Sequence, residues 1–244
     1  MNTTANNRDN RGAGAKPTVN PAERAALAWT QGARFLTTAS KLDQLPPPSL
    51  PEIAFVGRSN AGKSTAINTL AQHRRLAFAS KRPGRTQHIN LFDMGPPDAP
   101  DARLADLPGY GYAAVAKDAK RRWQQVMADY LAHRHALAGI VMMVDSRHGF
   151  TPLDLQLLDF VAPRVTMGEV KLLVLLTKVD KLSRNEAAKA MLAAQKGLVR
   201  LASEHADIGV LLFSALSRQG LGDAAMALRA WVPAIDEPAP APLV

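Results

Sequence analysis

One short stretch of the chain has the residue types and spacing of a phosphate-binding loop. It reads Gly57-Arg58-Ser59-Asn60-Ala61-Gly62-Lys63-Ser64 and fits the pattern G-x-x-x-x-G-K-[ST]. The two glycines allow backbone angles that let several N–H groups converge on one phosphate. Lys63 can reach the β- and γ-phosphates, and the Ser64 hydroxyl can bind Mg²⁺. The stretch therefore predicts a nucleotide P-loop, the alternative being a glycine-rich turn without a ligand.

The elements around this loop are those that such a site needs. The apolar run Ile53-Ala54-Phe55-Val56 precedes it and predicts a buried strand that delivers the loop to the edge of a sheet. A helix is expected over Lys63–Ala71, with the positive end of its dipole facing the anion.

Asp106-Leu107-Pro108-Gly109 follows a predicted strand over Arg103–Leu107. An acid at this place can hold Mg²⁺ through water, and the Gly109 amide can meet a γ-phosphate. By itself the tetrapeptide is a common turn. Its position downstream of a P-loop and a strand favours the nucleotide role.

Two further strand ends carry residues that could recognise a base. In Thr177-Lys178-Val179-Asp180, Asp180 can accept hydrogen bonds from N1–H and N2–H₂ of guanine, which adenine lacks there, and the Lys178 stem can cover the purine. Phe213-Ser214-Ala215 ends the next predicted strand, where backbone N–H groups could contact the base oxygen. The alternative in each case is a polar turn.

Predicted strands and helices alternate between Glu52 and Val232. This order is typical of an α/β fold, and we predict a mostly parallel six- to seven-stranded sheet with one antiparallel strand and helices on both faces. Ligands bind such sheets beyond the carboxyl ends of the strands. A helix is expected to begin after Thr151, to bury Leu153, Leu157, Leu158 and Val161, and to end at Pro163.

Composition divides the chain and limits its function. We predict a disordered tail over 1–20, a leading helix, strand and Pro-rich linker over 21–50, a nucleotide-binding domain over 51–233 and a Pro-rich tail over 234–244. The chain has no cysteine, no apolar run near the ~18 residues of a membrane span and no N-terminal signal core, which favours the cytoplasm. A net charge of +9 favours nucleic acid as a partner, the alternative being a merely basic soluble protein.

In this order the motifs resemble those of the small GTPases. The finer similarity is to the EngB (YsxC/YihA) family of ribosome-biogenesis GTP-binding proteins, within the Era/TrmE-like P-loop GTPases. It is carried by residues 51–64, by Pro83-Gly84-Arg85-Thr86-Gln87, by Asp106-Leu107-Pro108-Gly109-Tyr110-Gly111-Tyr112-Ala113, and by the two base-recognition motifs. The resemblance covers roughly Phe35 to Val232 and makes 51–233 a GTPase (G) domain.

The resemblance also implies roles for single residues. Residues 75–85 would be switch I and 107–120 switch II. Catalysis is expected to involve Lys63, Thr86 and Gly109. Mg²⁺ is expected at Ser64 and Thr86 and, through water, at Asp106, and Asn60 is a candidate ligand for K⁺. The nucleotide contacts implied are Gly57, Arg58, Ser59, Asn60, Ala61, Gly62, Lys63, Ser64, Gly84, Arg85, Thr86, Gln87, His88, Asp106, Leu107, Pro108, Gly109, Thr177, Lys178, Val179, Asp180, Phe213, Ser214 and Ala215.

Two positions depart from other GTPases. Tyr110 stands where Ras-like enzymes have a glutamine that orients the attacking water, so we expect slow intrinsic hydrolysis, raised by a partner or by K⁺. Thr177 stands where many GTPases have asparagine, and we interpret it as a trait of the family.

The expected partners are GTP or GDP and, from the resemblance, a precursor of the large ribosomal subunit and its rRNA. The resemblance also implies a role in cell division and septation. We further expect a monomer without a membrane span and without DNA as a partner. Basic residues flank the predicted site and suit rRNA: Arg74, Arg75, Lys81, Arg82 and Arg85 before it, and Lys117, Lys120, Arg121 and Arg122 after it. The alternatives are a nucleotide-gated RNA-binding module with negligible turnover and an ATP-using P-loop ATPase or kinase.

Overall fold

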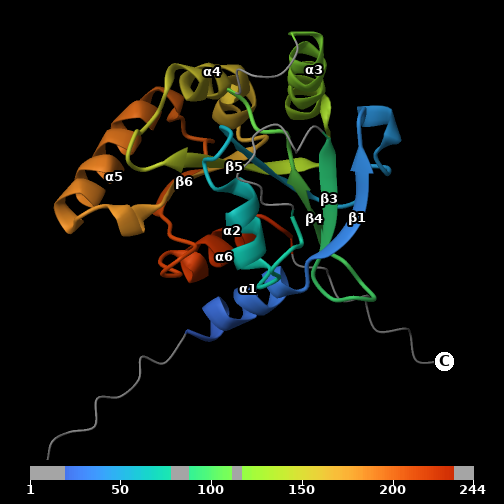
Figure 1. The fold of residues 1–244 in the computed structure, drawn as a ribbon. Coiled ribbons are helices and arrows are strands. Elements are labelled where there is room, and N and C mark those ends of the chain that lie inside the picture. The colour runs from blue at the N-terminus through green and yellow to red at the C-terminus, as the bar shows by residue number, and fades with distance from the viewer. Residues whose placement is uncertain (1–19, 78–87, 112–116, 234–244) are drawn as a thin grey trace, which may run out of the picture.

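Seven strands form a single sheet in the computed structural model, which describes residues 20–77, 88–111 and 117–233 (Figure 1). The strands are β1 (Arg34–Ala39), β2 (Glu52–Gly57), β3 (Ile89–Met94), β4 (Ala102–Asp106), β5 (Leu137–Asp145), β6 (Lys171–Thr177) and β7 (Ile208–Leu212). They lie in the order β1-β3-β4-β2-β5-β6-β7.

The directions of the described strands confirm the predicted topology. β2 pairs in parallel with β4 and β5, and β6 pairs in parallel with β5 and β7. β3 is antiparallel to both of its neighbours, β1 and β4. It is thus the one antiparallel strand in the described sheet. The turn after β3 contains Gly95 at φ +90°, a left-handed conformation that favours glycine.

Helices cover both faces of the sheet, as predicted. α1 (Pro21–Gln31), α2 (Lys63–Leu70) and α6 (Leu221–Ala230) lie on one face, and α3 (Lys117–His133), α4 (Pro152–Thr166) and α5 (Arg184–Leu198) lie on the other (Figure 1). Short 3₁₀ helices span Leu42–Gln44, Val179–Lys181 and Val199–Leu201. Of the helices described, none is long and apolar enough to cross a membrane.

Side chains along β2 point alternately to the two faces of the sheet, which explains why helices must cover both faces. Ile53 and Phe55 pack into the apolar cluster under α1, α2 and α6, whereas Ala54 and Val56 pack into the cluster under α3, α4 and α5. All four side chains are buried. A strand that buries both faces needs an uninterrupted apolar sequence, which is what precedes the P-loop.

The helix after Thr151 corrects two details of the sequence prediction. Leu153 is 38% exposed, and the acid Asp154 is buried in its place. Pro163 lies inside α4, which continues to Thr166. The fully buried side chain of Val165 lies beyond the proline, and its packing against the core favours continuation of the helix over termination at Pro163.

The opposite end of the sheet from the P-loop is held by a buried acid. Glu52 begins β2 and accepts hydrogen bonds from the Tyr130 hydroxyl at 2.5 Å and from the Arg134 guanidinium at 2.6 and 2.9 Å. Both partners come from α3 or its end, so this network fastens the C-terminal end of α3 to the start of β2.

Candidate nucleotide site

The predicted motifs meet at one edge of the sheet. The P-loop follows β2, Asp106 ends β4, Thr177 ends β6, and Ser214 comes shortly after β7. β2, β4, β6 and β7 run in the same direction, so their carboxyl ends lie on the same side. Segments that lie far apart in the sequence are thereby brought to one place, which is where α/β sheets bind ligands.

The P-loop has the backbone that its glycines predict. Asn60 and Gly62 both adopt left-handed angles, with φ of +66° and +98°, and α2 begins at Lys63 directly after them. A Cβ on Gly57 would lie 2.9 Å from the Met143 Cβ on β5, so the close approach of β2 to β5 requires glycine at the start of the loop. The first helical N–H groups therefore face the place expected for phosphate.

The residues expected to bind Mg²⁺ contain an unused acceptor. The Lys63 ammonium forms an ion pair with Asp106 Oδ1, and these side chains are 7% and 1% exposed. Asp106 Oδ2 is buried and has no hydrogen-bond partner in the described part of the chain. Buried carboxylate oxygens normally have a partner, and an oxygen donor set of this kind suits Mg²⁺ with its waters. The free oxygen of Asp106 therefore fits the metal that the sequence predicts.

Asp180 and Ser214 lie together at the end of the site where base recognition is predicted. The Ser214 hydroxyl, which is fully buried, donates a hydrogen bond to Asp180 Oδ1 at 2.7 Å. This hydrogen bond, more than any other contact, lowers the pKa of Asp180 below its usual value. Asp180 is therefore an ionised, acceptor-only group, as two N–H donors of guanine require.

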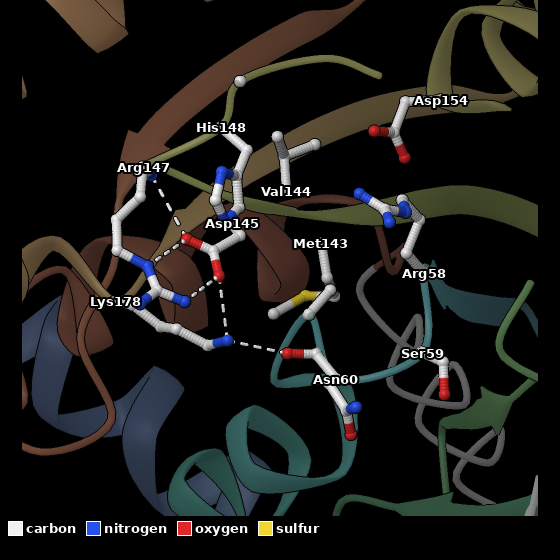
Figure 2. A pocket seen from close by; sticks show the side chains of 12 residues that line it. Arg58, Ser59, Asn60, Met143, Val144, Asp145, Arg147, His148, Asp154 and Lys178 are labelled. Carbon is white, nitrogen blue, oxygen red and sulfur yellow. Dashed lines mark hydrogen bonds and ion pairs between the residues drawn. The ribbon is translucent and has the colours of Figure 1, made fainter. Parts of the chain in front are cut away.

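Thr177 and Lys178 connect this end to the phosphate loop. The Thr177 hydroxyl donates to the Ala61 carbonyl oxygen at 2.7 Å. The Lys178 ammonium donates to the Asn60 carbonyl oxygen at 2.7 Å and to Asp145 Oδ2 at 2.9 Å (Figure 2). These hydrogen bonds thus hold the end of β6 against the P-loop.

Comparison with known proteins decides the family. The sequence profile described as "50S ribosome-binding GTPase" matches residues 52–178. The chain is 58% identical to the probable GTP-binding protein EngB of Albidiferax ferrireducens, over 84% of this chain and 96% of that protein. It is 50% identical to the EngB protein of Paraburkholderia phymatum, over 82% and 90% of the two chains. The chain belongs to the EngB family of P-loop GTPases. It is therefore a GTP-binding protein of a GTP-hydrolysing class.

Solved structures show the same fold. A crystal structure of a probable GTP-binding protein EngB superposes with a TM-score of 0.57 at 19% identity, over 74% of this chain and 97% of that one. The structure of Era in complex with MgGDPNP and nucleotides of 16S ribosomal RNA gives a TM-score of 0.58 at 21% identity, over 80% and 60% of the two chains.

A pocket of about 200 Å³ adjoins the P-loop of this EngB-family chain. It lies between the loop, the end of β5 and the start of α4, and it is lined among others by Arg58, Asp145, Arg147, His148 and Asp154 (Figure 2). Burial raises the pKa of Asp145, but hydrogen bonds from Arg147 and Lys178 outweigh that effect and hold the pKa below its usual range. The sequence patterns predicted no role in the site for Asp145 or Arg147. The one local signal is that Asp145 ends a continuous apolar run, Gly139–Val144, which is typical of a buried parallel strand.

Tyr110 is a packing residue in this structure. It is 5% exposed, and its hydroxyl donates to Asp154 Oδ1 at 2.8 Å. Burial raises its pKa, with a further contribution from the Asp154 charge, so the hydroxyl stays a neutral donor. A hydrogen bond therefore holds the Tyr110 side chain on α4, and the side chain does not take the place of a water-orienting glutamine.

The remaining predicted site residues fall into three groups. The side chains of Leu107, Val179 and Phe213 are buried in the apolar core, so they can meet a nucleotide only through their backbone. His88 contacts Ser40 at 2.9 Å, beside the outer strand β1. Four predicted contacts, the switch I residues Gly84, Arg85, Thr86 and Gln87, lie outside the described residues, as do Lys81, Arg82 and Tyr112.

Proposed function

We propose that this EngB-family GTPase is a Mg²⁺-dependent switch in the assembly of the large ribosomal subunit, with slow intrinsic GTP hydrolysis. Its place of action would be the cytoplasm, and a role in normal cell division and septation follows from the family resemblance. The observation that carries the proposal is that a strongly basic chain matches the profile described as "50S ribosome-binding GTPase".

Charge supports rRNA as the partner. The chain carries a net charge of +9. Arg74 and Arg75 are exposed shortly after α2, and Arg147 is 43% exposed beside the P-loop. Arginine at the rim of a nucleotide site can contact RNA phosphates while the γ-phosphate controls the neighbouring switch segments. A partner bound there would therefore sense which nucleotide is present.

The hydrolysis that we propose uses few side chains. Lys63 would exchange Asp106 for the β- and γ-phosphates, and the freed Asp106 would face the metal through water while Ser64 binds it directly. Mg²⁺, when bound, neutralises charge on the phosphates. Thr86 would help Ser64 to hold the metal, and the Gly109 amide would hold the γ-phosphate during in-line attack of water, in which the new O–P bond forms as the bond to GDP breaks. Because Tyr110 is bound to Asp154, it does not orient the water as a glutamine at this position would, which favours a slow rate.

Asn60 is the proposed ligand for an activating K⁺. It has a left-handed backbone at φ +66°, and within the described part of the chain its side-chain amide makes no hydrogen bond. Single-turnover hydrolysis measured in KCl and in NaCl tests this proposal. We expect faster hydrolysis in KCl for the wild type and no difference for Asn60→Ala, whereas equal wild-type rates would contradict a K⁺ site.

The hydrogen bond between Tyr110 and Asp154 in α4 also favours a second candidate function, that of an RNA-binding module with negligible turnover. Single-turnover hydrolysis with and without large-subunit particles separates the two. Stimulation by the particles supports the GTPase switch, and no product in either condition supports the module. Competition of labelled GTP by excess ATP tests the remaining alternative, because an ATP-using enzyme would lose its bound GTP.

The central experiment is co-sedimentation with large-subunit particles in a non-hydrolysable GTP analogue, in GDP and without nucleotide. We expect binding to the particles chiefly with the analogue. Asp180→Asn is the matched control, because it leaves the basic residues in place but changes the base that the site accepts. It should bind the particles with a xanthine analogue and not with the GTP analogue. Equal sedimentation of the wild type in GDP and in the analogue would contradict the switch.

A further inference from the structure

Lys178 is held at both ends of its side chain. Its backbone has a left-handed conformation, with φ of +60°, which is uncommon for a residue other than glycine. Its ammonium donates hydrogen bonds to the Asn60 carbonyl oxygen at 2.7 Å and to Asp145 Oδ2 at 2.9 Å. The apolar stem between these two points therefore has a fixed path from the end of β6 to the P-loop.

The residues on either side of Lys178 are fixed as well. The Thr177 hydroxyl donates to the Ala61 carbonyl oxygen at 2.7 Å, and the Val179 amide donates to the Phe213 carbonyl oxygen at 3.4 Å. An unfavourable backbone conformation persists only where the surrounding structure enforces it, and such residues are common at ligand sites. Tertiary contacts therefore set the conformation of Lys178.

Asp145 reaches Lys178 because of the strand register. It is the last residue of β5 and lies opposite Thr177, the residue before Lys178, in the parallel pairing with β6. Its side chain is 13% exposed. The side chains of Arg147 and Lys178 both point toward its carboxylate (Figure 2). The acid thus stands beside the lysine whatever the rest of the site contains.

Arg147 fixes the orientation of the Asp145 carboxylate. The backbone amide and Nε of Arg147 donate to Oδ1 at 3.1 and 2.9 Å, and its Nη2 donates to Oδ2 at 2.7 Å. Burial raises the pKa of Asp145, but the hydrogen bonds from Arg147 and Lys178 outweigh that effect and hold the pKa below its usual range. Asp145 is therefore an ionised acceptor on both of its oxygens.

A lysine stem that is fixed in advance is useful to a ligand. A free lysine side chain has many rotamers, and restricting them when a ligand binds costs free energy. Lys178 is already restricted by its two acceptors, so a purine that lies on its stem meets a surface in place. Without Asp145 the ammonium would keep only the Asn60 carbonyl oxygen, and the stem would regain part of its freedom.

We propose that Asp145 is a positioning residue for guanine-nucleotide binding, which holds the Lys178 ammonium so that the lysine stem lies ready for the face of the purine. Arg147 fixes the Asp145 carboxylate in turn, and Asp145 acts on the nucleotide only through Lys178. GTP and GDP gain equally, because they carry the same base. The inference rests on the proposed contact of Lys178 with the base and is independent of any ribosomal partner.

The variant Asp145→Asn tests this role, because it keeps the volume of the side chain and removes its charge. An amide has one accepting oxygen, so it cannot serve Lys178 and all the donors of Arg147 at once. We expect the affinities for GDP and for a non-hydrolysable GTP analogue to fall by the same factor, about fivefold to tenfold, the scale of one hydrogen bond.

The matched control is Asp159→Asn. It removes the charge of an acid that pairs with Arg200 on the surface, where the Asp159 side chain is 61% exposed. It should leave both affinities within about twofold of the wild type. A loss in Asp159→Asn as large as that in Asp145→Asn would show a general effect of charge and would overturn the role.

A double-mutant cycle shows whether Asp145 acts through Lys178. Lys178→Met removes the ammonium and keeps an apolar stem, and we expect it to weaken both nucleotides. In the Lys178→Met background, Asp145→Asn should change the affinities by less than about twofold, because its partner is already gone. An equal loss in both backgrounds, or no loss in either, would overturn the inference.

Inosine diphosphate separates the role of Lys178 from a general disturbance of the base site. It lacks the N2 amine that Asp180 is proposed to bind but has the same purine face. Asp145→Asn should therefore weaken GDP and inosine diphosphate by the same factor, and a reduced preference for GDP would contradict the proposal. A wild type that binds GDP no better than ADP would refute the guanine site itself, and equal sedimentation on particles would refute only the ribosomal switch.

Discussion

The hydroxyl of Thr177 donates a hydrogen bond to the carbonyl oxygen of Ala61, 2.7 Å away and 116 residues earlier in the chain. Thr177 is 3% exposed and also lies 3.2 Å from the Val144 carbonyl oxygen. The residue that stands in place of the usual asparagine therefore holds the P-loop to the ends of β5 and β6. It connects the P-loop to the strand end where base recognition is predicted.

We expect Thr177→Val to weaken both GTP and GDP about fivefold and to lower the free energy of unfolding by about 1–2 kcal/mol, because a buried carbonyl loses its donor. Fluorescent-nucleotide titration and urea unfolding measure these quantities. Thr38→Val is the control, since its hydroxyl donates to Asn90 Oδ1 at 2.7 Å on the exposed edge of the sheet. Nucleotide affinity that is unchanged in Thr177→Val would show that the bond does not couple the two sites.

Asp180→Asn should change the base preference from guanine to xanthine. An amide cannot accept two N–H donors as the carboxylate does, but it can donate to the additional oxygen of xanthine. We expect a loss of about 100-fold in GTP affinity together with a gain for XTP. Ser214→Ala serves as the graded companion: it removes the hydrogen bond to Asp180 and should weaken GTP by about tenfold without favouring XTP. Loss of both nucleotides in Asp180→Asn would indicate a folding defect and not a change of specificity.

The buried pair of Lys63 and Asp106 predicts that removing one of the two charges destabilises the nucleotide-free protein more than removing both. Lys63→Met leaves a carboxylate that is 1% exposed without its cation, and we expect the free energy of unfolding to fall by about 3 kcal/mol. The double variant Lys63→Met/Asp106→Asn should recover at least half of this loss. Urea unfolding with EDTA and without nucleotide is the measurement.

A partly exposed pair provides the control for that cycle. Glu169→Gln breaks the contact with Arg164, in which the Glu169 side chain is 55% exposed, and should change stability by less than about 1 kcal/mol. If Lys63→Met lowered the free energy of unfolding no more than Glu169→Gln does, the buried ion pair would not contribute to the stability of the nucleotide-free protein.

Asp145 predicts a dependence of stability on pH. Its pKa is lowered in the folded protein by Arg147 and Lys178, which outweigh burial, so the folded chain holds fewer protons than the unfolded chain at acid pH. The resulting stability is complete above the unfolded pKa of about 4 and is lost as the pH falls toward the folded value. Between pH 7 and pH 3 the wild type should lose about 0.5–1 kcal/mol more than Asp145→Asn, a range that allows for screening by solvent.

The matched control for the pH series is Asp159→Asn. Asp159 pairs with Arg200 on the surface, where its side chain is 61% exposed, and its replacement should leave the acid dependence close to that of the wild type. Parallel stability curves for the wild type and Asp145→Asn would remove Asp145 from the acid response.

The local patterns of the sequence were sufficient for the sheet and for the motifs on its edge. An apolar run before Gly57, a capping residue at Thr151 and alternating elements each act over a few residues, and the structure has the expected elements there. Two details of α4 were predicted wrongly, namely the burial of Leu153 and the end of the helix at Pro163. Helical spacing alone cannot show that an acid, Asp154, is buried through contacts with a tyrosine from another segment.

The amino-acid sequence by itself determined that the chain folds as an alternating α/β domain, and it predicted phosphate binding by a glycine-rich loop and recognition of guanine by Asp180. These properties depend on short-range geometry, namely the angles open to glycine, the period of apolar residues and the donors of one base. Only the tertiary structure decided that Lys63 pairs with Asp106, that Thr177 holds Ala61 and that Tyr110 faces Asp154. Strand order and the need of each buried polar group for a hydrogen-bond partner determine such pairs. The spacing of residues in the sequence contains no information on either.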